Sequence, residues 1–217
     1  MSNERSLAAA ILAGGHARRF DGVDKGALTV GDRPIIQRLA EVLRRVTPHV
    51  FAVGDRGGSA AAAGLRVVPD AVELGGALAG IYSAIVASPC ERTLVVGCDM
   101  PFVTERFIRH LATFDEADVV MPRSASGLEP LCAIYGRACA APILARLERG
   151  ERQAAVPLEG TQTVEISQEQ LAAFDPEGLL FVNVNTPHDY ARAQRMIARA
   201  TTTTLTKEID DDPITDV

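Results

Sequence analysis

The stretch Leu7-Ala8-Ala9-Ala10-Ile11-Leu12-Ala13-Gly14-Gly15 decides the fold of this 217-residue chain. It is a continuous apolar run that ends at two glycines. Such a run, without alternating polar residues, is typical of a central strand in a parallel sheet, because that strand is buried on both faces. The two glycines then predict a tight loop at the point where the strand ends.

Outward from this strand, strand and helix patterns alternate along the chain. Strands are predicted at Val50–Val53, Leu65–Val68, Thr93–Val96, Val119–Met121, Leu131–Tyr135 and Phe181–Val184. Helices are predicted behind Pro34, at Gly76–Ala87, at Thr104–Leu111 with Thr104 as the N-cap, at Ala138–Arg149, and from Thr186 onward. This order predicts an α/β fold, with a three-layer, doubly wound, mainly parallel Rossmann-like sheet. Ligands of such sheets bind beyond the carboxyl ends of the strands.

The composition favours a single cytosolic domain. Hydrophobic residues make up 47% of the chain, which is enough for one core, and we expect one domain over residues 1–200. No apolar run reaches the length of a membrane helix, and residues 1–5 lack the order of a signal peptide, so no membrane partner is expected. Residues 201–217, with four consecutive threonines and an acidic end, are predicted to form a disordered tail.

The charge and the cysteines argue against further classes of protein. A net charge of −6 disfavours a nucleic-acid partner. Residues 207–216 account for −4 of this charge, so the rest of the chain does not strongly repel a phosphorylated ligand. The four cysteines show no C-x-x-C spacing, which favours buried, reduced thiols over disulfides or a zinc site.

The loop after the first strand carries the residues of an anion-binding site. Gly14 and Gly15 let the backbone approach phosphate oxygens, and successive amide N–H groups can form a nest around them. Arg19 and Lys25 add charge, because a guanidinium grips two oxygens and an ammonium acts as a point charge. The spacing matches neither the dinucleotide fingerprint nor the P-loop. The alternative is an ordinary loop with solvated basic residues, and the combination of glycines and cations favours phosphate binding.

Asp99 is the candidate metal ligand. It follows the predicted strand Thr93–Val96 at the same sheet edge as the glycines, and a Mg2+ ion that bridges phosphates needs only one or two protein carboxylates. A lone aspartate at this position is otherwise a helix cap or a turn residue. Asp70, which follows the strand that ends at Val68, is a candidate for contacting the base or ribose, or else a turn carboxylate.

Several motifs occur in the order found in one known family. The stretch from Leu12 to Lys25 resembles the L-A-G-G-x-x-x-R-x-x-x-x-D-K signature of the molybdenum cofactor guanylyltransferases, the MobA family. The resemblance continues through Gly76-Ala77-Leu78-Ala79-Gly80, Cys98-Asp99-Met100-Pro101, Glu129-Pro130-Leu131-Cys132-Ala133 and Asn183-Val184-Asn185-Thr186-Pro187. It implies a nucleotidyltransferase fold and the transfer of GMP from GTP to molybdopterin, with release of pyrophosphate.

The resemblance also implies roles for matching residues. The residues implied to hold the nucleotide are Leu12, Ala13, Gly14, Gly15, Lys25 and Asp70, and Asp99 would bind the cofactor Mg2+. Gly80 either lets a helix approach the guanine or only punctuates that helix. Arg19, Lys25 and Asp99 form the candidate catalytic set.

The acceptor is assigned to three polar residues. Asn183 and Asn185 share one face of the predicted last strand, where their amides suit the pterin or its phosphate; hydrogen bonding to a neighbouring loop is the alternative. Arg152 is a further candidate for the acceptor phosphate, or else a solvated arginine.

Three positions depart from the family pattern. Asp21 stands where the family usually has glycine, and Ala77 stands where it usually has proline. The family often carries an asparagine near Asp55 that assists nucleotide binding, and whether Asp55 substitutes for it is open.

The implied mechanism is in-line attack by the acceptor phosphate on the α-phosphorus of GTP, with Mg2+, Lys25 and Arg19 stabilising charge. A cytidylyltransferase with the same acceptor, or a sugar-phosphate nucleotidyltransferase, is the alternative within this class. Relatives specific for CTP tend to show L-A-A-G, where this chain has Gly14. An alternative of another class is a nucleotide-binding regulator without turnover. Transient contacts with other molybdenum cofactor biosynthesis proteins or apo-molybdoenzymes are expected.

Overall fold

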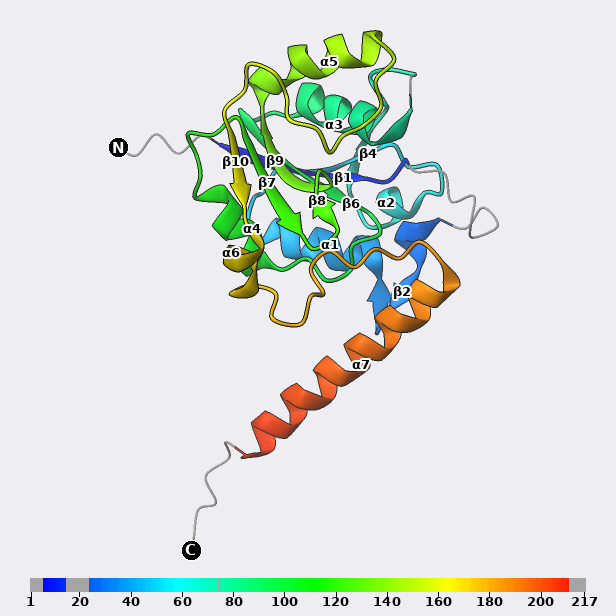
Figure 1. Cartoon of the computed structure of the whole chain (residues 1–217). Coiled ribbons are helices and arrows are strands. Elements are labelled where there is room, and N and C mark those ends of the chain that lie inside the picture. The colour runs from blue at the N-terminus through cyan, green and yellow to red at the C-terminus, as the bar shows by residue number, and fades with distance from the viewer. Residues whose placement is uncertain (1–5, 15–23, 74, 211–217) are drawn as a thin grey trace, which may run out of the picture.

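A single large sheet organises the protein (Figure 1). The structure is a computed structural model that describes residues 6–14, 24–73 and 75–210. From one edge to the other, the strands are β10 (Thr163–Ile166), β7 (Val119–Ser124), β9 (Cys132–Gly136), β6 (Arg92–Gly97), β1 (Leu7–Leu12), β4 (Val50–Val53) and β5 (Arg66–Val68). Neighbouring strands on this path are parallel, except that β9 is antiparallel to both β6 and β7. The short β8 (Gly127–Leu128) pairs with β7, and β2 (Thr29–Val30) forms a separate hairpin with β3 (Arg33–Pro34).

β1 lies in the middle of the sheet, as its apolar sequence predicts. Residues 8–11 have no exposed surface, and they alternate between the two faces of the sheet. Leu12 is in register with Val53 of β4 on one side and with Gly97 of β6 on the other. Because these three strands run in the same direction, their carboxyl ends meet at one edge of the sheet.

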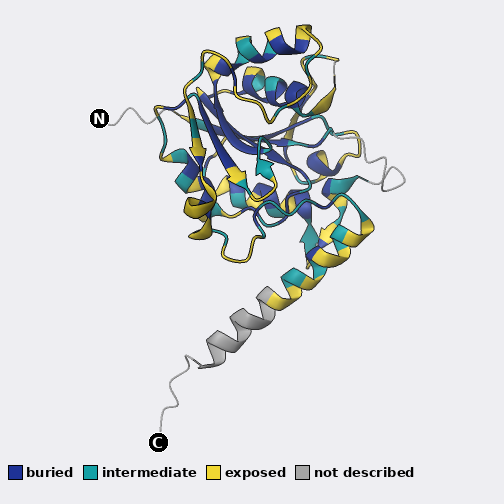
Figure 2. Cartoon of the chain, in the orientation of Figure 1, coloured by how far each residue is buried: buried dark blue, intermediate teal, exposed yellow. Residues whose placement is uncertain are grey.

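Helices cover both faces of the sheet (Figure 1). On one face lie α3 (Gly76–Ala87) and α5 (Ala140–Glu148), and on the other lie α1 (Ile35–Arg44) and α4 (Glu105–Ala112). Each face has its own buried apolar cluster, and Figure 2 shows the central strands and the inner sides of the helices as buried. The predicted three-layer, doubly wound, mainly parallel sheet is confirmed. The shorter helical segments are η1 (Lys25–Ala27), α2 (Ser59–Ala62), η2 (Arg137–Cys139) and α6 (Gln168–Ala172).

Local sequence explains where α1 and α4 begin. Pro34 precedes α1 with a backbone φ of −57°, close to the helical value, and Ile36, Leu39 and Leu43 are buried at helical spacing. α4 begins after Thr104, whose hydroxyl oxygen accepts a hydrogen bond of 3.3 Å from the Phe107 amide. This is the N-cap that the sequence predicts.

The prediction of a strand at Phe181–Val184 is wrong, because this segment pairs with no strand of the described sheet. The Asp175 carboxylate accepts hydrogen bonds from two backbone amides that follow it, which folds the chain into a turn. Beyond the turn, the Val184 amide donates to the Asp99 carbonyl oxygen over 2.9 Å. The segment therefore crosses the end of the sheet instead of joining it.

The C-terminal part of the chain also differs from expectation. β10 was not predicted, and it adds a parallel edge strand beside β7. α7 (Pro187–Asp210) begins where predicted but continues through residues 201–210, which were expected to belong to a disordered tail. No glycine or proline interrupts the sequence between Pro187 and Asp210, so nothing there ends the helix. Residues 211–217 lie outside the described residues.

Figure 1 shows α7 extending away from the body of the protein. Among the described residues, no helix, α7 included, is both long enough and apolar enough to cross a lipid bilayer.

Candidate functional site

A cavity of about 300 Å³ opens at the carboxyl ends of β1, β4 and β6. We call it the glycine cavity, because glycines from the segments after β1, before and within α3, and at the end of β6 line it. It contains every described residue that was expected to hold the nucleotide, namely Leu12, Ala13, Gly14, Lys25, Asp70, Gly80 and Asp99. Gly15, Arg19 and Asp21 lie outside the described residues.

Lys25 and Asp99 are paired inside this cavity. The Lys25 Nζ atom lies 3.3 Å from Asp99 Oδ2 and 2.5 Å from the side-chain oxygen of Asn185. The Lys25 and Asp99 side chains are only 19% and 18% exposed, so water screens their attraction less than in a surface ion pair. The predicted phosphate-binding cation and the predicted metal ligand are therefore direct neighbours.

Asp24, the residue before Lys25, has a structural role. Its carboxylate accepts hydrogen bonds from the Gly26 amide at 2.9 Å and from the Ser59 amide at 3.2 Å. The carboxylate packs directly over Gly57, where an added Cβ atom would overlap it. The aspartate of the D-K pair thus ties η1 to α2 and fixes the backbone from which the lysine projects.

Gly54 brings the ends of β1 and β4 together. It has a φ of +63°, in the left-handed region, and a Cβ atom there would lie only 2.8 Å from the Gly14 Cα atom. At Gly14 the situation is different, since an added Cβ would meet the Gly54 Cα atom at 3.5 Å and Asp70 Oδ2 at 3.6 Å, both ordinary contacts. Glycine is sterically required at position 54 but not at position 14.

Two further glycines set the positions of side chains in the cavity. A Cβ atom on Gly97 would lie 2.8 Å from Asp99 Oδ1, so glycine at this position leaves room for the Asp99 carboxylate. A Cβ atom on Gly80 would lie 2.8 Å from a methyl group of Leu12. Gly80 therefore allows α3 to pack closely on the end of β1.

Two further aspartates at this edge of the sheet, Asp70 and Asp55, make different contacts. Asp70 lines the glycine cavity, with its carboxylate against Gly14. Both oxygens of Asp55 accept backbone hydrogen bonds, from the Ala60 and Ala61 amides at 3.1 and 2.8 Å. Asp55 thus holds the start of α2.

Arg56, directly after Asp55, also lines the glycine cavity. Sequence reasoning missed this residue, because a single arginine after a short strand carries no signal of its own.

Cys98 also lines the cavity, next to Asp99. Burial, together with the negative charge of Asp99, raises the pKa of its thiol to about 12. A thiol with this pKa stays protonated at neutral pH. The four cysteines are buried and unpaired, as their spacing predicts.

The residues of the glycine cavity fit a Mg2+ ion that is held mainly through phosphate. Asp99 is a carboxylate that already attracts a cation, the Lys25 ammonium. Among the described residues, no group of three or more His, Cys, Asp or Glu side chains could hold a metal ion by itself. Such an ion would therefore need oxygens from a triphosphate and from water in addition to Asp99.

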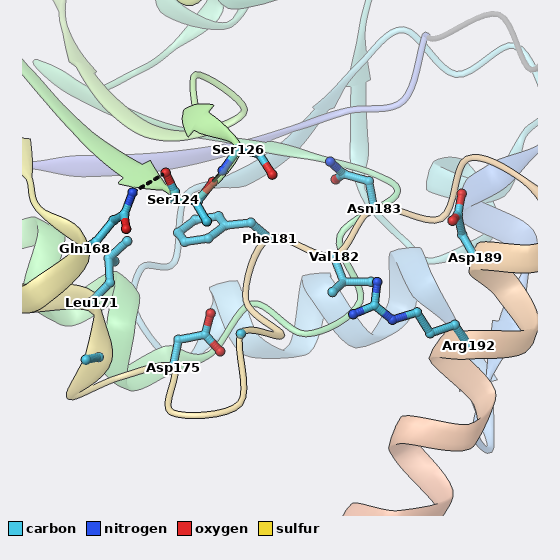
Figure 3. Close-up of a pocket in the computed structure, with 13 residues that line it drawn as sticks. Ser124, Ser126, Gln168, Leu171, Asp175, Phe181, Val182, Asn183, Asp189 and Arg192 are labelled. Atoms are coloured by element: carbon cyan, nitrogen blue, oxygen red, sulfur yellow. Dashed lines mark hydrogen bonds between the residues drawn. The ribbon is translucent and has the colours of Figure 1, made fainter.

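A second cavity, of about 460 Å³, lies beside the segment that follows α6 (Figure 3). We call it the polar cavity, and its polar lining residues include Ser124, Ser126, Gln168, Asn183 and Arg192. Figure 3 shows Asn183 and Arg192 at one end of this cavity, near Asp189, with the serines and Gln168 toward the other end. Gln168 donates a hydrogen bond of 3.1 Å to the Ser124 carbonyl oxygen.

The structure does not bring the three predicted acceptor residues together. Asn183 lines the polar cavity, whereas Asn185 contacts Lys25 of the glycine cavity. The expectation that both asparagines lie on one strand face fails because the segment is not a strand. Arg152 lies at a third place, where its guanidinium donates a long hydrogen bond of 3.4 Å to the carbonyl oxygen of Gly75, at the start of α3.

A glycine-lined cavity at the strand ends of a doubly wound sheet, with an ammonium and a carboxylate side by side, defines a nucleotide-binding α/β protein. Residues 9–166 match the MobA-like NTP transferase domain family, and the chain belongs to this family. The resemblance recognised in the sequence is confirmed.

Relatives and solved structures agree with this family. A probable molybdenum cofactor guanylyltransferase of Pelotomaculum thermopropionicum is 36% identical over 193 residues, which cover 88% of this chain and 94% of the relative. A molybdenum cofactor guanylyltransferase of Desulfosudis oleivorans is 29% identical, over 86% of this chain and 94% of the relative. The molybdopterin-guanine dinucleotide biosynthesis protein A of Archaeoglobus fulgidus has a TM-score of 0.74 and 27% identity, with 89% of this chain and all of that chain covered.

Proposed function

We propose that this protein transfers GMP from GTP to molybdopterin, which forms molybdopterin guanine dinucleotide and releases pyrophosphate. The observation that carries the proposal is the Lys25–Asp99 pair inside the glycine cavity, in a chain 36% identical to a probable molybdenum cofactor guanylyltransferase. An oxygen of the acceptor phosphate attacks the α-phosphorus of GTP, and the bond from this phosphorus to the β-phosphate oxygen breaks. The attacking phosphate is already ionised, so no general base is needed.

The residues of the glycine cavity would act by position and charge. The Lys25 ammonium stabilises the triphosphate and the charge that develops on the leaving pyrophosphate. Asp99 would hold Mg2+, which when bound neutralises phosphate charge and orients the phosphate oxygens. Arg19 is proposed to add a second positive charge, and the glycines let backbone amides approach the phosphates.

We propose the polar cavity as the site of molybdopterin. Asn183 and the two serines of this cavity offer hydrogen bonds to a pterin, and the Arg192 guanidinium suits its phosphate. The cavity lies next to the glycine cavity along the chain, since Asn183 and the Lys25-bound Asn185 are two residues apart. An acceptor in the polar cavity and a nucleotide in the glycine cavity would therefore meet near Asn185.

The variant Gly14→Ala tests the proposed specificity for the guanine base. An added Cβ would contact Gly54 and Asp70 at ordinary distances, so we expect the variant to fold normally. The methyl group would occupy cavity space beside Asp70, where the resemblance places the nucleotide. We expect turnover with GTP to fall in this variant while turnover with CTP does not.

The central experiment supplies the protein with Mg2+, molybdopterin and one nucleoside triphosphate at a time, and identifies the product by mass. GTP should be consumed with release of pyrophosphate, and CTP and ATP should be much poorer substrates. A CMP adduct as the main product would change the base assignment. GTP binding without pyrophosphate release would favour a nucleotide-binding regulator, and transfer to a sugar phosphate would change the acceptor.

A further inference from the structure

We propose that Asn185 is a positioning residue for Lys25, and that it controls nucleotide affinity instead of contacting the acceptor. The inference rests on the proposed function, because it concerns how the same site holds GTP. It begins with the contact between the two side chains. The Asn185 amide oxygen accepts a hydrogen bond from Lys25 Nζ at 2.5 Å, whereas the Asp99 carboxylate lies farther from the ammonium, at 3.3 Å.

Asn185 is itself held firmly. Its backbone amide donates to Asp189 Oδ2 over 3.2 Å, and the Thr186 hydroxyl donates to the same oxygen over 2.9 Å. On its other side, Val184 is fully buried and its amide donates to the Asp99 carbonyl oxygen. The residue is thus fastened both to the start of α7 and to the end of β6, which makes it a rigid support for a flexible lysine.

The chemistry of the amide explains why an asparagine suits this position. A lysine ammonium has three N–H donors at the end of a flexible four-carbon chain, so without a partner it samples many positions. A neutral amide oxygen takes up one donor without cancelling the positive charge. Asp99 accepts a hydrogen bond from a second N–H group, so the third donor remains for phosphate oxygens.

The two partners of Lys25 also differ in what happens when Mg2+ binds. The Asp99 carboxylate is the proposed ligand of the ion, so its attraction for Lys25 is then shared with a divalent cation. The Asn185 oxygen carries no charge to attract that cation, and it continues to hold the ammonium inside the glycine cavity. Asn185 therefore keeps Lys25 aligned in the state that binds nucleotide.

The test measures the Kd of GTP with Mg2+, without acceptor, by calorimetry on the full chain. Asn185→Ala should weaken GTP binding about tenfold, which is typical for loss of a hydrogen bond to a charged group. The matched control is Asn183→Ala, two residues away and lining the polar cavity, which should leave the Kd of GTP unchanged. Circular dichroism and thermal unfolding show whether each variant is folded.

A double-mutant cycle separates positioning from a general structural effect. In a Lys25→Ala background, Asn185→Ala should cause no further loss of GTP affinity, because there is no ammonium left to position. Additive losses in the double variant would overturn the inference. So would an unchanged Kd of GTP in Asn185→Ala together with weaker binding of the acceptor. Wild-type protein that binds no GTP would instead overturn the proposed function, and the inference with it.

Discussion

The glycine cavity and the polar cavity are built from different parts of the fold. The glycine cavity lies at the ends of β1, β4 and β6, whose backbones are held by ladder hydrogen bonds on both sides. The polar cavity is lined by the turn after β7, by α6 and the irregular segment behind it, and by the first turns of α7. Strand ends provide a preformed site, whereas loops can change without altering the core.

This difference assigns the two halves of the proposed reaction to two kinds of structure. In this proposal the strand ends of the sheet bind the phosphates, which are common to all nucleoside triphosphates. The acceptor is bound by segments in which turns and helix ends position the side chains. Substitutions in the two cavities should therefore differ in which substrate they affect and in how much they cost in stability.

The largest expected effect comes from Asp99→Asn in the glycine cavity. The amide has the same shape as the carboxylate but brings no negative charge to Mg2+, so we expect transfer to fall by about 100-fold or more. Pyrophosphate release measured over a range of Mg2+ concentrations checks this, and thermal unfolding monitors the fold. Undiminished turnover at ordinary Mg2+ levels would show that another group is the principal ligand.

Backbone packing can be compared between Gly54, which contacts Gly14 of the glycine cavity, and Gly178 of the polar cavity. Their φ values are nearly equal, +63° and +66°, but a Cβ on Gly54 would lie 2.8 Å from Gly14, whereas Gly178 has nothing within 4 Å. We expect Gly54→Ala to lower the free energy of unfolding by about 2–3 kcal/mol and Gly178→Ala by about 1 kcal/mol. Urea unfolding measures both, and equal losses would show that the strand ends are free to separate.

Arg192→Ala should affect only the acceptor side. Loss of a guanidinium hydrogen bond to a phosphate is expected to raise the KM of molybdopterin about tenfold while the Kd of GTP stays constant. Arg195→Ala is the matched control, since it removes the same charge from α7 at an exposed position that does not line the polar cavity. If both variants raise the KM equally, the net charge of α7 matters and the position of Arg192 does not.

The smallest expected effect is that of Asp189→Asn, a residue that lines the polar cavity. Burial raises the pKa of Asp189, but hydrogen bonds from the Thr186 hydroxyl and from the backbone amides of Asn185 and Thr186 together outweigh this effect. The pKa therefore lies below its ordinary value of 3.8. The ionised carboxylate therefore stabilises the fold above about pH 4, and this stabilisation is lost as the pH falls through the lowered pKa.

Replacement by asparagine should accordingly lower the free energy of unfolding by about 0.5–1 kcal/mol at pH 7. At pH 2 the variant and the wild type should unfold at nearly the same denaturant concentration. A difference that persists in acid would mean that the carboxylate acts through its shape and not through its charge.

The glycine cavity could largely be predicted from the sequence, because its residues follow strands with strong local patterns. The run Leu7–Leu12 identifies the central strand, and parallel pairing then requires Gly14 and Asp99 to meet at one edge. The role of Asp24 could not be predicted in this way. Its carboxylate binds the amide of Ser59, and no periodicity connects residues of two separate helical segments.

The polar cavity could not be predicted, for a related reason. The alternation of Val182 and Val184 with asparagines resembles a strand, but the turn made by Asp175 and the bond from Val184 to Asp99 take the segment away from the sheet. Likewise, the contact between Lys25 and Asn185 joins residues 160 positions apart. Local sequence patterns cannot predict such a contact, because the contact forms only in the complete fold.

The central place of β1 has a consequence for how the protein is made. β1 leaves the ribosome before both of its partners, Val50–Val53 and Arg92–Gly97, so its second edge stays open until β6 has been synthesised. Until then, an uncharged apolar segment with unpaired backbone groups is exposed, and segments of this kind aggregate readily. The stretch that specifies the fold is thus the part of the nascent chain that most needs protection, and the cavity it borders cannot close before Asp99 emerges.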